Sequence, residues 1–274
     1  MLSDCHFDEI VDPAAIEGAN CFNRAIALKR LERVLDRVHI LTRDFYKGVT
    51  YDGAVLLLGG DLLSGDIHEE LSETNEDAML GSLDFWASQL TGFIEGLADL
   101  FTPLHIVGVV GNHGRTTRKP RHKRKVRSNL DWLLYRTVAR QIRRDRVTWE
   151  ISDASDTEVK IYSTSYRLTH GDQFHGGGGI SGMMAPLMRG QHRKALRQMG
   201  LDKPFDWLVM GHWHQYLHGM GLIVNGALKG YDEYAYDHNF LSERAQQAFW
   251  LTTPEAGAAF RSPIFCDDRK SEGW

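Results

Sequence analysis

Short apolar runs rich in branched side chains recur along this chain and restrict its fold more than any other feature. They occupy residues 54–58, 104–110, 166–169, 207–210, 222–224 and 248–251. Runs of this kind, bounded by turn-forming residues, are typical of buried strands. Stretches with helical character, around 18–40, 76–100, 127–144 and 187–199, precede or separate several of the runs. The alternation predicts an α/β fold in layers, with helices packed on sheets.

The length and composition are those of a compact protein. A chain of 274 residues can bury a full core without dividing, so we expect a single domain over residues 1–274. Apolar residues make up 42% and charged residues 25%, which leaves no case for disorder or a fibrous repeat. No apolar run approaches the roughly 20 residues needed to cross a bilayer, and no signal peptide is recognisable. The three cysteines, at unrelated spacings, indicate reduced thiols. We expect a cytoplasmic protein that does not contact membrane, and these features define no oligomeric state.

Polar residues that bind hard or borderline cations stand at the ends of several strand-like segments. Asp4 and His6 flank Cys5 near the start, and in an extended segment both would point to one face. Asp61 follows the run at 54–58, at the carboxyl end where open α/β sheets bind ligands. Asn112, with His113 beside it, follows the run at 104–110. Each position offers an oxygen or nitrogen ligand at a strand end.

The later runs end in the same way. His170 closes the run at 166–169, and His212 and His214 follow the run at 207–210, where alternation again predicts one shared side. A single histidine at a strand end is more often structural than ligating, so each segment alone is weak evidence. Five such segments in one chain predict a metal centre.

In this order, the five segments resemble the motif series of the calcineurin-like metallophosphoesterases, over residues 4–214. The resemblance implies central mixed β-sheets in a sandwich flanked by helices. It also implies an enzyme that hydrolyses phosphate esters with water or hydroxide activated between two divalent metal ions. One ion would be held by Asp4, His6, Asp61 and His214, and the other by Asp61, Asn112, His170 and His212. Mn²⁺ is the first expectation, and Fe, Zn²⁺, Co²⁺ and Mg²⁺ are the alternatives.

The resemblance assigns a catalytic role to His113, which would stabilise the transition state or protonate the leaving oxygen. The family usually has an acid after this histidine, whereas Gly114 and Arg115 follow it here. The group that orients His113 is therefore absent or comes from elsewhere in the chain. Arg115 is a candidate for binding the substrate phosphate through its two-pronged guanidinium.

Two sequence features depart from the family pattern or lie outside it. Only three residues precede Asp4, where the family has a full buried strand, so we expect in-frame apolar codons upstream. The glycine run at 176–179 predicts a loop, because its backbone is too permissive for a regular element.

Positive charge is concentrated in one part of the chain. Residues 115–146 contain 13 Lys and Arg residues against two acids, a net charge of +11 within a chain of net charge −4. A run of this kind is often no more than a solvated surface. Because it begins directly after the predicted metal-binding turn, contact with an anionic substrate is an equal alternative, and DNA or RNA is the leading candidate partner.

Three functions are consistent with these features. The leading one is a nucleic-acid phosphodiesterase, a nuclease of the type found in double-strand-break repair complexes, and it depends on the basic segment. The second is a phosphomonoesterase acting on nucleotides, phosphoproteins or small phosphate esters, because the metal centre alone does not select the ester. The third is a metal-stabilised binding module without turnover.

Overall fold

The computed structural model describes residues 1–175 and 182–274, and the glycine run at 176–179 lies outside the described residues. The strands form three sheets. The first is parallel, with order β1-β2-β3: Ala54–Leu58, Leu104–Gly108 and Val147–Ile151. The second is mixed, with order β4-β5-β6-β8-β7: Asp156–Ile161, Thr164–Thr169, Trp207–Met210, Leu222–Val224 and Leu217–Gly219. The third is an antiparallel pair, β9 (Gln246–Thr253) and β10 (Gly257–Phe265).

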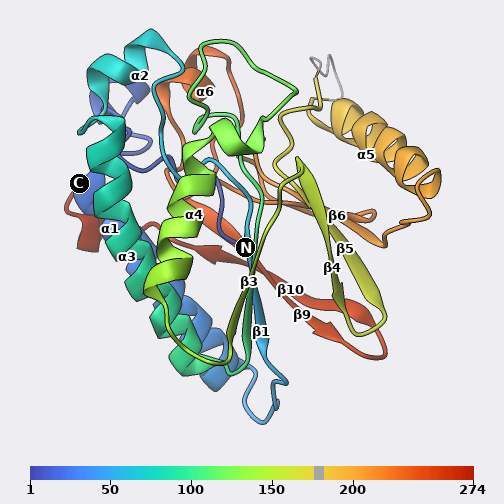
Figure 1. Cartoon of the computed structure of the whole chain (residues 1–274). Helices are drawn as coiled ribbons and strands as arrows, with labels where there is room; N and C mark the ends of the chain where they lie inside the picture. The colour runs from blue at the N-terminus through green and yellow to red at the C-terminus, as the bar shows by residue number, and fades with distance from the viewer. Residues whose placement is uncertain (176–181) are drawn as a thin grey trace.

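Helices cover the outer faces of the sheets (Figure 1). The long helices beside the first sheet are α1 (Arg24–Ile40), α3 (Met79–Leu100) and α4 (Leu130–Gln141). Helix α5 (Met184–Met199) lies beside the second sheet. The short elements are α2 (Glu69–Thr74), α6 (Glu233–Asp237), α7 (Arg269–Glu272), the 3₁₀ turns Pro13–Ile16 and Val126–Ser128, and the π turn Leu41–Phe45. Within the part of the chain that the structure describes, no helix is long and apolar enough to cross a membrane.

Three apolar clusters show the order of the layers. In β1, Leu56 and Leu58 belong to the cluster with α1, α3 and α4, whereas Leu57 belongs to the cluster between the sheets. In β6, Val209 faces that same central cluster, and its neighbour Leu208 packs in the cluster that includes Leu187 of α5. Alternation along each strand therefore gives the order helices, first sheet, second sheet, helix. The predicted α/β layers flanked by helices are confirmed.

Some observed strands were missed by the prediction because polar and apolar residues are mixed in them and no continuous apolar run is present. Strands β1, β6 and β8 have their predicted bounds. Strands β3, β4, β7 and β10 were not predicted. β4 is the sequence DTEVKI, whose burial is intermittent because one face is solvated, so it contains no apolar run. The first long helix begins at Arg24 rather than at residue 18, because the Asn23 side chain caps it by accepting from the Ile26 N–H at 2.9 Å.

The predicted extended conformation at the start of the chain is wrong. Asp4 and His6 have φ values of 51° and 46°, so this segment turns through left-handed conformations after a single bridge from Leu2 to Leu58. The Met1 ammonium group donates to the carbonyl of Ala248 at 2.9 Å, and burial lowers its pKa to about 5. A mainly apolar cavity of about 750 Å³ lies beside this start, bounded by β1, β9 and residues of α1 and α3.

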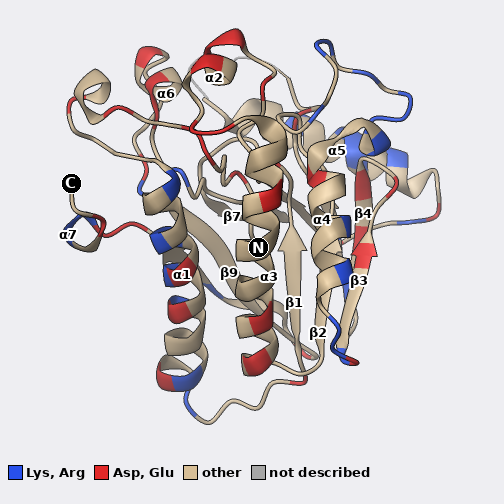
Figure 2. Cartoon of the chain, turned by 60° about the vertical axis from the view of Figure 1, so that its left-hand side comes forward, with Lys and Arg blue, Asp and Glu red and all other residues tan. Residues whose placement is uncertain are grey.

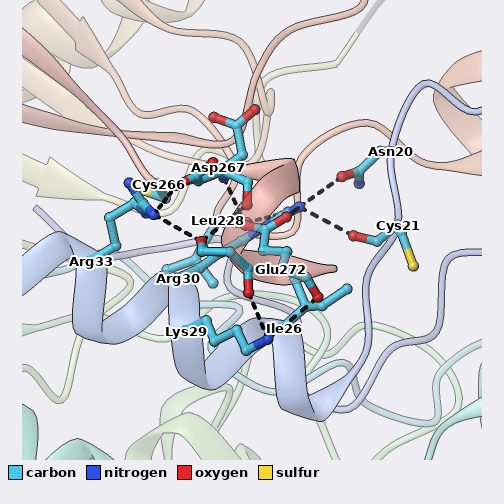
Figure 3. A network of polar contacts seen from close by, with 12 residues as sticks. Asn20, Cys21, Ile26, Lys29, Arg30, Arg33, Leu228, Cys266, Asp267 and Glu272 are labelled. Carbon is cyan, nitrogen blue, oxygen red and sulfur yellow. Dashed lines mark hydrogen bonds and ion pairs between the residues drawn. The ribbon is translucent and has the colours of Figure 1, made fainter. Parts of the chain in front are cut away.

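A buried arginine connects the first long helix to the carboxyl-terminal end (Figure 3). Arg30 is fully buried, and its Nε lies 3.0 Å from Glu272 Oε1. The remaining guanidinium N–H groups donate to Asn20 and to backbone carbonyls of Cys21, Leu228 and Lys229, at 2.6 to 3.1 Å. A buried charge of this kind is tolerated only because its donors are satisfied. The network attaches α1 to α7 and to the segment that enters the site described below.

Replacing Arg30 with Met should destabilise the protein by about 3–5 kcal/mol, because Glu272 is left buried without its partner. The double variant Arg30→Met/Glu272→Gln should recover part of this loss. Urea unfolding followed by circular dichroism measures both. Arg37→Met, an exposed position on the same helix, serves as the control. A loss below about 1 kcal/mol in Arg30→Met would show that the network is not a structural constraint.

Candidate metal centre

The predicted ligands come from five segments that meet at one end of the sheets. Asp61 and Asn112 follow β1 and β2 of the first sheet, and His170 follows β5 of the second. The two histidines after β6 have left-handed φ values, 69° at His212 and 53° at His214. The alternation predicted for them is therefore wrong, and each histidine joins a different cluster of ligands. The site lies where the carboxyl ends of strands from both sheets come together.

Among the described residues, potential ligand atoms form three overlapping groups, and within each group the atoms lie within 4.8 Å of one another. The groups are Asp4, His6 and His214; His6, Asp61 and His113; and Asp61, His170 and His212. Asp61 therefore belongs to two of the groups, one with His6 and His113 and the other with His170 and His212. Six of the seven predicted ligands belong to these groups, and the seventh, Asn112, contacts His170 directly.

The contacts of His170 indicate that a cation belongs at this position. Its Nδ1 lies 2.9 Å from the Gly59 carbonyl, which requires a proton on that nitrogen. Its Nε2 then faces two further acceptors, Asp61 Oδ2 at 2.9 Å and Asn112 Oδ1 at 3.1 Å. Three lone pairs that converge in a buried space repel one another unless a proton or a metal ion lies between them. A ligating histidine fixed by a backbone carbonyl is the usual arrangement in metal sites.

The group of Asp4, His6 and His214 also brings potential ligand atoms close together. His6 Nε2 lies 3.2 Å from His214 Nε2, and His214 Nε2 lies 3.6 Å from Asp4 Oδ1. The other nitrogen of His6 lies 3.2 Å from Glu9 Oε2, an ion-pair distance without hydrogen-bond geometry. Glu9 in turn binds Lys229 at 2.7 Å, and both side chains are buried. Neither Glu9 nor Lys229 was predicted from the sequence, because nothing local distinguishes them from surface charges.

Asp131 positions the two loops of the first sheet. Its Oδ2 accepts the backbone N–H groups of Asp61 and Gly111, each at 2.9 Å, and its Oδ1 accepts that of Leu62 at 3.2 Å. The carboxylate lies in the first turn of α4, whose N-cap is Asn129. A side chain at Gly111 would clash with the Asp61 carboxylate, so glycine is required there. The sequence offered one signal for Asp131, its place near the start of the helix predicted around 127–144.

His113 is oriented by a group that the sequence did not reveal. Its Nδ1 lies 2.7 Å from the carbonyl of Ser64, and its backbone N–H donates to Asp61 Oδ1 at 2.7 Å. Its ring meets that of His6 edge-on, with centroids 4.5 Å apart. The Ser64 carbonyl therefore orients the ring and leaves Nε2 available to the site.

Burial and mutual charge shift the pKa values in the site strongly. Burial raises the pKa of Asp4 to about 7, and burial together with the charge of His170 lowers that of His212 to about 4. Although burial works in the opposite direction, the contact with Asp61 raises the pKa of His170 to about 10. Without a metal ion, a proton on His170 compensates the buried carboxylate. A metal ion that binds there must displace that proton, because a ligating imidazole is neutral.

Arg115 lies in the loop after Asn112, and its side chain contacts backbone carbonyls of that loop. Its Nη1 donates to the Asn112 carbonyl and its Nε to the Thr117 carbonyl, each at 3.1 Å. These bonds support the loop that carries Asn112, and binding of substrate phosphate by Arg115 stays a prediction.

No protein-family model and no curated protein sequence matches this chain. Solved structures of Vps29 from Entamoeba histolytica are similar to parts of it. A single mutant aligns over 72% of this chain and 83% of its own, at 18% identity and a TM-score of 0.30. The wild type complexed with Zn²⁺ aligns over 60% and 82%, at 16% identity and a TM-score of 0.27. A double mutant aligns over 53% of this chain and 66% of its own, just under two thirds, at 17% identity and a TM-score of 0.27. Likeness of this degree assigns neither a family nor an activity to the chain.

Asp131→Asn should lower the affinity for Mn²⁺ by about 10–100-fold, because an amide cannot accept from three N–H groups and the loops that carry Asp61 and Asn112 shift. Isothermal titration of the metal-free protein measures the affinity. Asp145→Asn, which removes an exposed acid of the same segment, is the matched control. Unchanged affinity in Asp131→Asn would show that Asp131 does not position the ligands.

Proposed function

We propose that this protein is a phosphoesterase that depends on two divalent metal ions, and that its substrate is a nucleic-acid phosphodiester. The observation that carries the proposal is the convergence of all seven predicted ligands, from five separate segments, on one buried site. Chance placement of seven such residues along the chain would not bring them to one edge of two sheets.

In this proposal, the first ion is held by Asp4, His6, Asp61 and His214, and the second by Asp61, Asn112, His170 and His212. The donor set is oxygen and imidazole nitrogen without thiolate, which suits Mn²⁺, Fe, Zn²⁺ or Co²⁺ better than Mg²⁺, an ion that prefers oxygen ligands. The ions would polarise the phosphoryl oxygens and lower the pKa of a bound water molecule. The buried carboxylates and the backbone contacts of the histidines fix these ligands in place before substrate arrives.

His113 is proposed as the group that stabilises the leaving oxygen. Burial lowers its pKa below the ordinary value, so near neutral pH the ring is neutral. With its single proton on Nδ1 and directed at Ser64, the neutral ring has a lone pair on Nε2, so Nε2 must first take up a proton from solvent before it can donate one to the leaving oxygen. A positioned acid–base group of this kind contributes about 10²–10⁴-fold to the rate.

The choice of a nucleic acid depends on the basic segment. From residue 118 to residue 124, all five Lys and Arg side chains form no ion pair within the described residues: Arg118, Lys119, Arg121, Lys123 and Arg124. All five are exposed. Figure 2 shows this loop in blue at the same end of the molecule as α2 and α6, whose ribbons carry red acidic positions. A polyanion would therefore approach from the basic side, and its binding should weaken with salt.

The two alternative functions predict different outcomes in one assay. A phosphomonoesterase would prefer p-nitrophenyl phosphate, and a binding module would release product from neither ester. With added Mn²⁺, wild type should instead hydrolyse bis-p-nitrophenyl phosphate faster than the monoester. Asp61→Ala should abolish turnover, because it removes the ligand shared by both ions. His113→Ala should reduce kcat by about 10²–10⁴-fold while the protein retains its bound metal.

Asp145→Ala, an exposed position, controls for general effects of substitution. Diester turnover that persists in Asp61→Ala would contradict the proposed mechanism. No turnover by a wild type that binds two metal ions per chain would favour the binding module.

A further inference from the structure

A second cavity, separate from the predicted ligands, lies between α5 and the segment that follows β5. Its volume is about 210 Å³. Gln173, Phe174 and His175 form one wall, and α5 forms the other. Four cationic side chains of this helix line it: Arg189, Arg193, Lys194 and Arg197. No carboxylate is among its described lining residues.

The positive charge around this cavity exceeds the negative charge available to balance it. The buried carboxylate of Asp156 accepts from Lys194 at 2.7 Å, from Arg167 at 2.9 Å and from Arg197. One negative charge therefore serves three cations. Arg189 and Arg193 form no ion pair within residues 1–175 and 182–274, and both are exposed at the mouth of the cavity. Lys194 is only 5% exposed, so a buried ammonium group lies in the wall.

The spacing along α5 makes this arrangement unfavourable without an anion. Arg189, Arg193 and Arg197 follow one another at four-residue intervals, so their side chains share one face of the helix. Like charges at this spacing destabilise a helix. A phosphate would remove the repulsion, because each guanidinium offers two parallel N–H donors that match phosphate oxygens.

The wall of the cavity belongs to the segment that contains His170. Lys194 also donates to Thr169 at 3.2 Å, and Asp172 pairs with Lys125 of the basic segment at 2.5 Å. Gln173 lies three residues after His170, so their Cα atoms are at most about 11 Å apart. Successive phosphates on one strand of a duplex are separated by a rise of roughly 3.4 Å, so a distance of this size corresponds to about three phosphates. The segment 169–173 therefore contains the predicted metal ligand His170, lines the cavity and, through Asp172, contacts Lys125 of the basic segment.

We propose that this cavity binds a phosphate of a polynucleotide substrate, a few nucleotides away from the phosphodiester that is cleaved. The proposal rests on the proposed function, since it supplies the second contact that separates a polynucleotide from a small ester. A small diester occupies the metal centre alone. A longer strand also reaches Arg189 and Arg193, so it binds more tightly and its binding depends more on salt.

The test compares Arg189→Ala/Arg193→Ala with wild type. The matched control is Arg37→Ala/Lys47→Ala, which removes two exposed cations on or near α1. Binding of a fluorescein-labelled 12-nucleotide single strand is followed by anisotropy in EDTA, where no cleavage occurs. Hydrolysis of bis-p-nitrophenyl phosphate is measured separately with Mn²⁺. Thermal unfolding confirms that the variants fold.

The double variant should bind the strand at least tenfold more weakly. The slope of log K against log salt is negative, and its magnitude should decrease by about 0.7 because one phosphate contact is lost. Hydrolysis of the small diester should stay at the wild-type rate. Strand binding equal to that of wild type, or equally weakened in the control, would overturn the proposal and leave the proposed function intact. Weakened strand binding in a protein that hydrolyses no diester would retain the cavity as a phosphate site and reject the catalytic function.

Discussion

The burial of two carboxylates beside one another is the constraint on which this site depends. Asp4 and Asp61 are almost inaccessible to solvent, and each raises the energy of the other's charge. Such charges are tolerated only where donors and counter-charges surround them. Here the backbone N–H groups of His212 and His113 bind the carboxylates at 2.8 and 2.7 Å, and five histidines face them. The arrangement is costly for folding alone and is suited to holding cations.

The layers of the fold make this concentration of charge possible. Each sheet buries alternate side chains against helices on one side and against the other sheet on the other, so the strand ends are held firmly. The loops that carry the predicted ligands begin at these strand ends, so the packed sheets determine where each loop starts. Asp131, outside the ligand set, determines how the loops after β1 and β2 lie together. A site assembled from five segments therefore depends on contacts well beyond its ligands.

The sequence predicted the parts of this structure that local chemistry determines. Apolar runs such as 207–210 gave strands at the correct bounds, and the polar residues after them proved to lie together. The prediction that Asp4 and His6 share an extended segment was wrong although both reach the site, because left-handed turns rather than alternation direct them. The contacts of His113 with Ser64, and of Glu9 with Lys229, join residues 49 and 220 positions apart. No local pattern could indicate such pairs, since they exist only once the layers have packed.

The proposed site holds two metal ions that share Asp61, and electron paramagnetic resonance of the Mn²⁺-loaded protein can detect such a pair. A shared carboxylate holds the ions about 3.5–4 Å apart, close enough for their spins to couple. We expect two Mn²⁺ ions per chain and the spectrum of a coupled pair. A single uncoupled Mn²⁺ per chain, with all ligands intact, would contradict it.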